Sequence, residues 1–171
     1  MIVKFSIWRI LADHLKTFKN AGSKQYRPLD FITFLFIPTA IAAGVTYYGY
    51  LLTKEIINAL LTSLSVFAAL LFNLLMLVYG LVQKNGEVKQ EAESKYGKVR
   101  LEFLKEIYAN ISFCILITVI AIALLLVTFI GIDHKRLTYI LTFFSYSLTA
   151  IFLFTLLMIL RRVHSLLFKE L

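Results

Sequence analysis

The sequence predicts an all-α fold, a bundle of four transmembrane helices arranged as two antiparallel hairpins. Composition is the first observation that predicts it. Of 171 residues, 60% are hydrophobic and 16% are charged, whereas soluble domains are close to half apolar and a quarter charged. A chain of this length buries only part of its surface in its own core. Lipid is therefore expected to cover the excess, around one membrane domain.

The second observation is that four long stretches lack Asp, Glu, Lys, Arg and His. They cover residues 31–53, 56–82, 107–132 and 137–160. Each is longer than the about 20 residues that a helix needs to cross a hydrocarbon core of about 30 Å. Hydrocarbon offers the backbone no hydrogen-bond partners, so each stretch is expected to be helical. The transmembrane domain is expected over residues 29–162.

Two short connections predict how these spans pair. Only Lys54 and Glu55 separate the first two spans, and residues 133–136 separate the last two. Helices joined by so few residues usually lie side by side in opposite directions. The sequence therefore predicts two tight antiparallel hairpins.

The distribution of basic residues predicts the orientation. The segment before the first span, the loop between the second and third spans, and the C-terminal end with its tail 163–171 together hold fifteen Lys and Arg. The other two connections hold three. Basic flanks remain in the cytoplasm, so both termini are expected there. Because such flanks explain the net charge of +8, direct nucleic-acid binding is not expected.

Residues 1–28 are expected to form a cytoplasmic or interfacial segment that contains an amphipathic helix over 2–19. Its polar side carries Ser6, Arg9, Asp13, Lys16 and Thr17, and its apolar side carries Phe5, Trp8, Leu11, Ala12, Leu15 and Phe18. Two interpretations remain open. The helix lies in the membrane interface, anchored by Trp8, Arg9 and Lys16, or it caps the cytoplasmic end of the bundle.

A further cytoplasmic helix is expected over 85–106, between the second and third spans. It carries a narrow seam, namely Val88, Ala92, Tyr96, Val99 and Phe103. One interpretation is an extension of the third span that packs on its own bundle. The other is a docking face for a cytoplasmic protein partner.

The spans carry stripes of small and weakly polar side chains, which recur every three or four residues and so share one helix face. In the second span the stripe consists of Asn58, Thr62, Ser65, Ala69, Asn73, Met76 and Gly80. In the third span it consists of Asn110, Cys114, Thr118, Ala121 and Thr128, and in the fourth of Thr138, Thr142, Ser145 and Thr149. The first span adds Thr33, Ala40 and Gly44 beside Pro38, where a kink is expected.

Such stripes allow membrane helices to pack closely, with interhelical hydrogen bonds of about 0.6–2 kcal/mol each. The alternative is that some of them line a water-filled pore or cleft, for instance between subunits. Asn58 and Asn73 matter most, because an unpaired amide in hydrocarbon costs several kcal/mol. Each of these two amides must find a partner or water.

No residue pattern predicts catalysis. The three histidines, His14, His134 and His164, lie on different segments, so a shared metal site is not expected. The spans contain no ionisable residues of the kind that proton relays and ion-coupled transporters use. Cys114 is the only cysteine, which excludes an intrachain disulfide. The sequence predicts neither an enzyme nor a cofactor.

The stretches SLSVFAALLFNLLMLVYG and KEIYANISFCILI, with two hairpins around a charged cytoplasmic helix, resemble small membrane proteins of bacterial anti-phage loci. The layout is similar to the membrane subunit of the Kiwa defence system and, more loosely, to the phage Rex membrane protein of superinfection exclusion. The resemblance implies an oligomeric sensor or effector of the bacterial inner membrane with a cytoplasmic partner that touches nucleic acid. It assigns no functional residue. A small ion channel or depolarising pore, and a membrane scaffold, are the alternatives.

Overall fold

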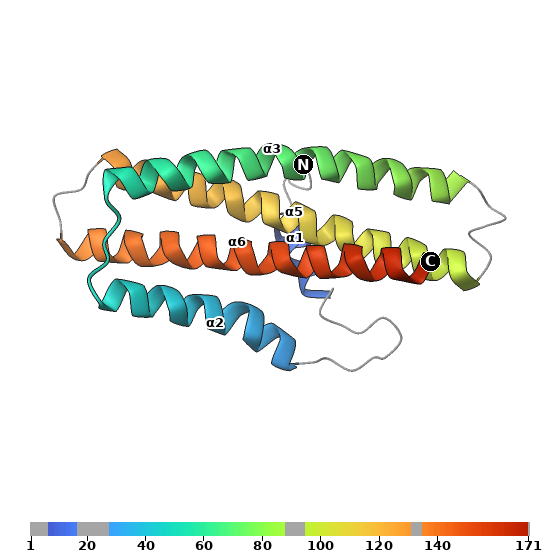
Figure 1. Cartoon of the computed structure of the whole chain (residues 1–171), viewed down its shortest axis with the longest axis horizontal. Helices are drawn as coiled ribbons and strands as arrows, with labels where there is room; N and C mark the ends of the chain where they lie inside the picture. The colour runs from blue at the N-terminus through green and yellow to red at the C-terminus, as the bar shows by residue number, and fades with distance from the viewer. Residues whose placement is uncertain (1–6, 17–27, 88–94, 131–134, 171) are drawn as a thin grey trace.

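The computed structural model describes residues 7–16, 28–87, 95–130 and 135–170, and all of its regular structure is helical (Figure 1). The helices are α1 (Ile7–Lys16), α2 (Pro28–Tyr47), α3 (Lys54–Glu87), α5 (Lys95–Ile130) and α6 (Lys135–Glu170). The predicted all-α bundle is confirmed for this part of the chain.

Three helices are long and apolar enough to cross a membrane. These segments are Lys54–Lys84 of α3, Leu101–Ile130 of α5 and Lys135–Arg161 of α6. None contains Pro, which would remove a backbone donor and clash with the preceding turn. In α2, Pro28 occupies the first helical position, where its missing N–H costs nothing, and Leu35–Tyr47 forms a shorter apolar stretch.

The α5 helix is the centre of the bundle. It packs against α3, α6 and α1, whereas α2 packs against α6. Within the described residues α2 and α3 do not pack against each other, and they lie on opposite sides of α6 in Figure 1. The tight hairpin expected for the first two spans is therefore wrong.

The connection between α2 and α3 explains this difference. Residues 48–53 lie outside both helices, and Gly49 takes a positive φ of 81° that a residue with a side chain adopts at a cost. An extended chain covers about 3.3 Å per residue, so these six residues reach about 20 Å, enough to pass another helix. The backbone N–H of Ile56 then donates to the Thr53 hydroxyl over 3.4 Å, which caps the start of α3.

The expected cytoplasmic helix 85–106 is divided between two longer helices. α3 continues to Glu87, and α5 begins at Lys95 and runs without interruption to Ile130. Residues 88–94 lie outside the described part of the chain. The C-terminal half of this segment is therefore an extension of the third span, and its Leu104 is buried in the bundle.

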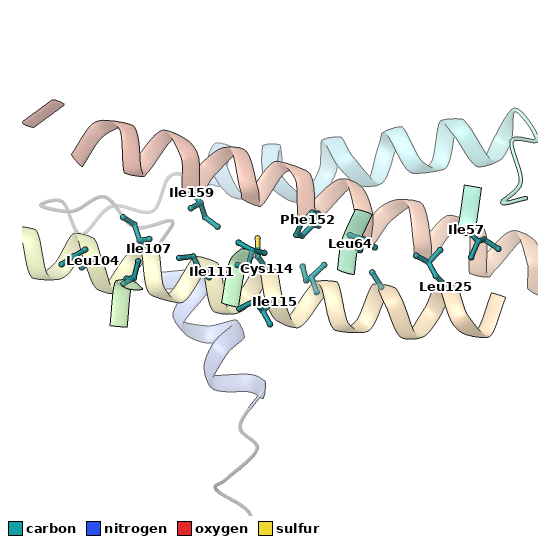
Figure 2. Close-up of a cluster of buried hydrophobic side chains, with 14 residues drawn as sticks. Ile57, Leu64, Leu104, Ile107, Ile111, Cys114, Ile115, Leu125, Phe152 and Ile159 are labelled. Atoms are coloured by element: carbon teal, nitrogen blue, oxygen red, sulfur yellow. The ribbon is translucent and has the colours of Figure 1, made fainter. Parts of the chain in front are cut away.

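A continuous apolar core joins α3, α5 and α6. On α3, the buried residues recur every seven positions and face α5, namely Ile57, Leu64, Leu71 and Val78. Ile111, Cys114 and Leu125 of α5 and Phe152 of α6 complete the centre of this cluster (Figure 2). The ring of Phe67 meets the edge of Phe152 at a centroid distance of 5.7 Å, so α3 also contacts α6.

Leu71→Ala and Leu70→Ala should differ sharply in stability, because Leu71 is 3% exposed and its neighbour Leu70 is 58% exposed. In detergent the side chain at position 71 stays in apolar surroundings even when the helices separate. The cost at Leu71 is therefore mainly that of lost packing, about 2 kcal/mol at the low end for Leu→Ala. For a chain of this size that corresponds to a melting temperature about 4–8 °C lower. Thermal unfolding in detergent measures it, and an equal decrease for Leu70→Ala would contradict the packing of α3.

Candidate functional site

The polar stripes of α5 and α6 lie inside the bundle. Asn110, Cys114 and Thr118 of α5 and Thr142 and Ser145 of α6 are all 0% exposed. Small side chains at such positions allow two helices to approach closely. This part of the predicted polar set therefore lies where helices pack.

Hydroxyl groups in this interior mostly return to their own helix. The Thr118 hydroxyl donates to the backbone carbonyl oxygen of Cys114 over 2.8 Å, and the hydroxyl of half-buried Thr149 donates to the backbone carbonyl oxygen of Ser145 over 2.8 Å. The buried hydroxyls of Thr142 and Ser145 have no hydrogen-bond partner among the described residues. Pro38 of α2 is also fully buried.

The polar stripe of α3 lies on the outside of the bundle. Asn58, Thr62, Ser65 and Asn73 are all exposed, and Ala69, Met76 and Gly80 of the same stripe are exposed with them. The reason is that the seam of Ile57, Leu64, Leu71 and Val78 faces α5 and turns the polar stripe away. The stripe that the sequence analysis identified in the second span thus forms an outer surface. This surface is called the α3 polar stripe and consists of Asn58, Thr62, Ser65, Ala69, Asn73, Met76 and Gly80.

Two kinds of polar group occur on the α3 polar stripe. The hydroxyls of Thr62 and Ser65 donate to the carbonyls of Asn58 and Leu61, over 2.9 and 2.7 Å. The amide side chains of Asn58 and Asn73 make no hydrogen bond within the described residues. The hydroxyls are satisfied by their own helix, and the two amides are not.

The two unpaired amides differ in depth. Asn58 lies three residues from Glu55, about 4.5 Å along the helix, close to where charged groups meet water. Asn73 lies eleven residues from Lys84, the nearest charged residue of α3, which is about 16 Å. Asn73 therefore lies deeper in the apolar segment of α3 than Asn58 does.

A second polar feature joins α1 to α5. His14 is only 5% exposed, and its Nδ1–H donates to Oδ1 of Asn110 over 2.8 Å. Its ring stacks on Phe113 with centroids 3.7 Å apart and planes 9° from parallel. The polar edge and the flat face of the imidazole thus both contact α5. These contacts hold α1 in place, and α1 crosses α5 at an angle (Figure 2).

Sequence reasoning did not find this contact between His14 and Asn110. It named His14 only as one of three histidines on different segments, and no spacing relates two residues 96 positions apart. The available signal was Asn110 itself, because an amide in an apolar stretch requires a partner. Of the expected anchors, Trp8 and Arg9 are exposed, and the side chain of Lys16 is not among those described.

The expected docking seam is described only in part. Phe103 is half-buried and packs against the core of its own bundle. Tyr96 and Val99 lie in α5 with side chains outside the described set, and Val88 and Ala92 lie outside the described residues altogether.

In the described part of the chain, no three His, Cys, Asp or Glu side chains are grouped so that they could hold a metal ion. Comparison of the sequence and fold with protein-family models, curated proteins and solved structures gives no match.

His14→Ala and Asn110→Ala should each destabilise the protein by about 1–3 kcal/mol, because each leaves a buried polar partner without its hydrogen bond. The double variant should cost less than the sum of the two, with a coupling energy of about 0.5–3 kcal/mol. Thermal unfolding in detergent provides the cycle, with exposed Arg9→Ala as the control on α1. Strict additivity would contradict the contact.

Proposed function

We propose that this chain is a non-catalytic, four-span membrane protein that self-associates through the α3 polar stripe. The observation that carries the proposal is Asn73, an exposed amide on the outer face of a long apolar helix, far from any charged residue of that helix.

Several features support four spans. Beyond the three long apolar helices, α2 has 20 residues and is about 30 Å long at 1.5 Å per residue, the thickness of a hydrocarbon core. At one end of the bundle the rings of Tyr47, Tyr48 and Tyr50 are exposed, as in the aromatic belts of membrane proteins. At the other end Lys84 and Lys105 are exposed, which agrees with a cytoplasmic location for that end.

Few hydrogen-bond partners are then within reach of the Asn73 amide. Its own helix offers it no hydrogen bond, and lipid tails have neither donors nor acceptors. Leaving the amide unpaired in such surroundings costs several kcal/mol. A polar group at the same depth on another helix is the direct solution.

A second copy of the chain supplies such a group. All copies insert in the same direction, so two α3 helices related by a twofold axis along the membrane normal place Asn73 beside its equivalent. An amide is both donor and acceptor, so two amides satisfy each other. Ala69 and Gly80 of the same stripe leave room for the helices to approach. The α3 polar stripe is therefore self-complementary.

Asn73→Leu should weaken the oligomer and Asn58→Leu should not, because only Asn73 lies beyond the reach of water. An interhelical hydrogen bond of about 0.6–2 kcal/mol corresponds to a dissociation constant raised roughly 3- to 30-fold. Energy transfer between labelled copies, titrated against lipid, measures the change. Equal effects of the two substitutions, or none from Asn73→Leu, would contradict the α3 interface.

The resemblance to membrane proteins of anti-phage loci suggests the biological setting. We place the oligomer in the bacterial inner membrane as a sensor or effector of a defence complex. Its basic end, where α3 ends and α5 begins, faces the cytoplasm and meets a protein partner there. The chain itself is not assigned a nucleic-acid site.

A depolarising pore is the second candidate function, and the exposed α3 polar stripe favours one particular form of it. Because this stripe lies outside the bundle, any lumen that it lines runs between copies rather than through one chain. A scaffold for other membrane proteins would use the same surface without a lumen.

Phage challenge separates these functions. Bacteria that express the chain together with the genes flanking its own should form fewer plaques, and Asn73→Leu should restore plaque formation. A potential-sensitive dye should report depolarisation on infection if copies form a pore, and a steady potential if they act as a sensor or scaffold. Unchanged plaque numbers over a broad phage panel would argue against a defence role.

A further inference from the structure

The α1 helix packs a polar side chain on α5 and leaves large apolar side chains exposed. In a soluble protein an amphipathic helix packs its apolar face on the core, and its polar face meets water. In α1 the most deeply buried residue is His14, at 5% exposure, with half-buried Ile10 and Leu11 beside it, whereas Trp8, about 120° around the helix from His14, is 80% exposed. Leu15 and Ile7 are exposed as well, at 41% and 51%.

The exposed apolar side chains indicate what surrounds the outer side of α1. Among the described helices α1 packs against α5 alone, so no other helix covers Trp8. A large indole ring with apolar neighbours is poorly placed in water but well placed where an apolar phase meets a polar one. The side of α1 that faces away from the protein is therefore suited to contact with lipid.

The depth of α1 agrees with that assignment. His14 contacts Asn110, which lies four residues inward of Glu106, about 6 Å along α5. Interfacial helices bury their apolar face about 5–10 Å into the boundary between headgroups and acyl chains. Exposed Lys105 and, at the end of the α6 span, exposed Arg161 mark the headgroup level on neighbouring helices.

Charge supports the same position. Arg9 is exposed on α1 beside the apolar face, and Lys84 is exposed at the same end of the bundle. Basic side chains at this level attract anionic headgroups, and a long arginine can extend from an apolar surface to reach them. Lipid therefore complements α1 in both its apolar and its charged groups.

We propose that α1 is an interfacial membrane helix that docks sideways on α5 through His14, and that its exposed side chains Trp8 and Leu15 lie among lipid acyl chains near anionic headgroups. The proposal rests on the membrane setting proposed above but not on self-association. It replaces a cap on the end of the bundle with a helix at its side.

Trp8 is the only tryptophan of the chain, so the intrinsic fluorescence of the unmodified protein reports this helix alone. The full chain is reconstituted into vesicles of phosphatidylcholine and phosphatidylglycerol, with bromine atoms placed near the headgroup or near the chain ends. Trp8 should emit at short wavelength and lose most of its intensity to the shallow bromines. Acrylamide in the water should quench it weakly.

A matched variant separates the two proposals. In Trp8→Phe with Phe72→Trp, the single tryptophan moves to an exposed mid-span position of α3, where the deep bromines should quench it. The α1 proposal would be overturned if lipid quenches the tryptophan at position 72 of this variant, while Trp8 of the unmodified protein is open to acrylamide and unaffected by brominated lipid. That outcome would leave the membrane setting intact. Absence of lipid quenching at both positions would overturn the membrane setting as well.

Discussion

The structure depends on one constraint, namely that a polar side chain at membrane depth must find its hydrogen-bond partner in protein. The described residues show two ways of meeting it. Hydroxyls such as that of Thr118 donate to the carbonyl one turn earlier in their own helix. Asn110 is paired by His14 of a separate helix. Asn73 has neither solution within the described residues, and this difference gives α3 a surface of a different kind from those of α5 and α6.

The same constraint explains what the sequence could and could not predict. Long uncharged stretches fix the helices, because hydrocarbon leaves the backbone no alternative. They do not fix which face packs, because lipid tails are as apolar as leucine and give helices no hydrophobic reason to associate. The stripes that begin at Asn58 and at Asn110 have nearly the same spacing, yet the first is exposed and the second is buried. What separates them is the leucine-rich seam of α3, whose fit to α5 is a matter of shape.

The sequence alone could not predict how the helices pair or how α1 is buried, for related reasons. Short connections suggest neighbours, but an extended link such as 48–53 passes a third helix, so α2 packs on α6. For α1, the pattern correctly separates a polar from an apolar side. It does not show which residues pack on α5 and which stay exposed. The position of His14 on Phe113 decides the question, and only the structure supplies it.

The two proposed surfaces are connected through α5. His14 pairs with Oδ1 of Asn110 and so ties α1 to α5. Leu71 and Val78 hold α3 on another face of the same helix, and this fixes the direction in which Asn73 points. In the two proposals, α1 and α3 share one support but face different surroundings, lipid for Trp8 and a second copy for Asn73.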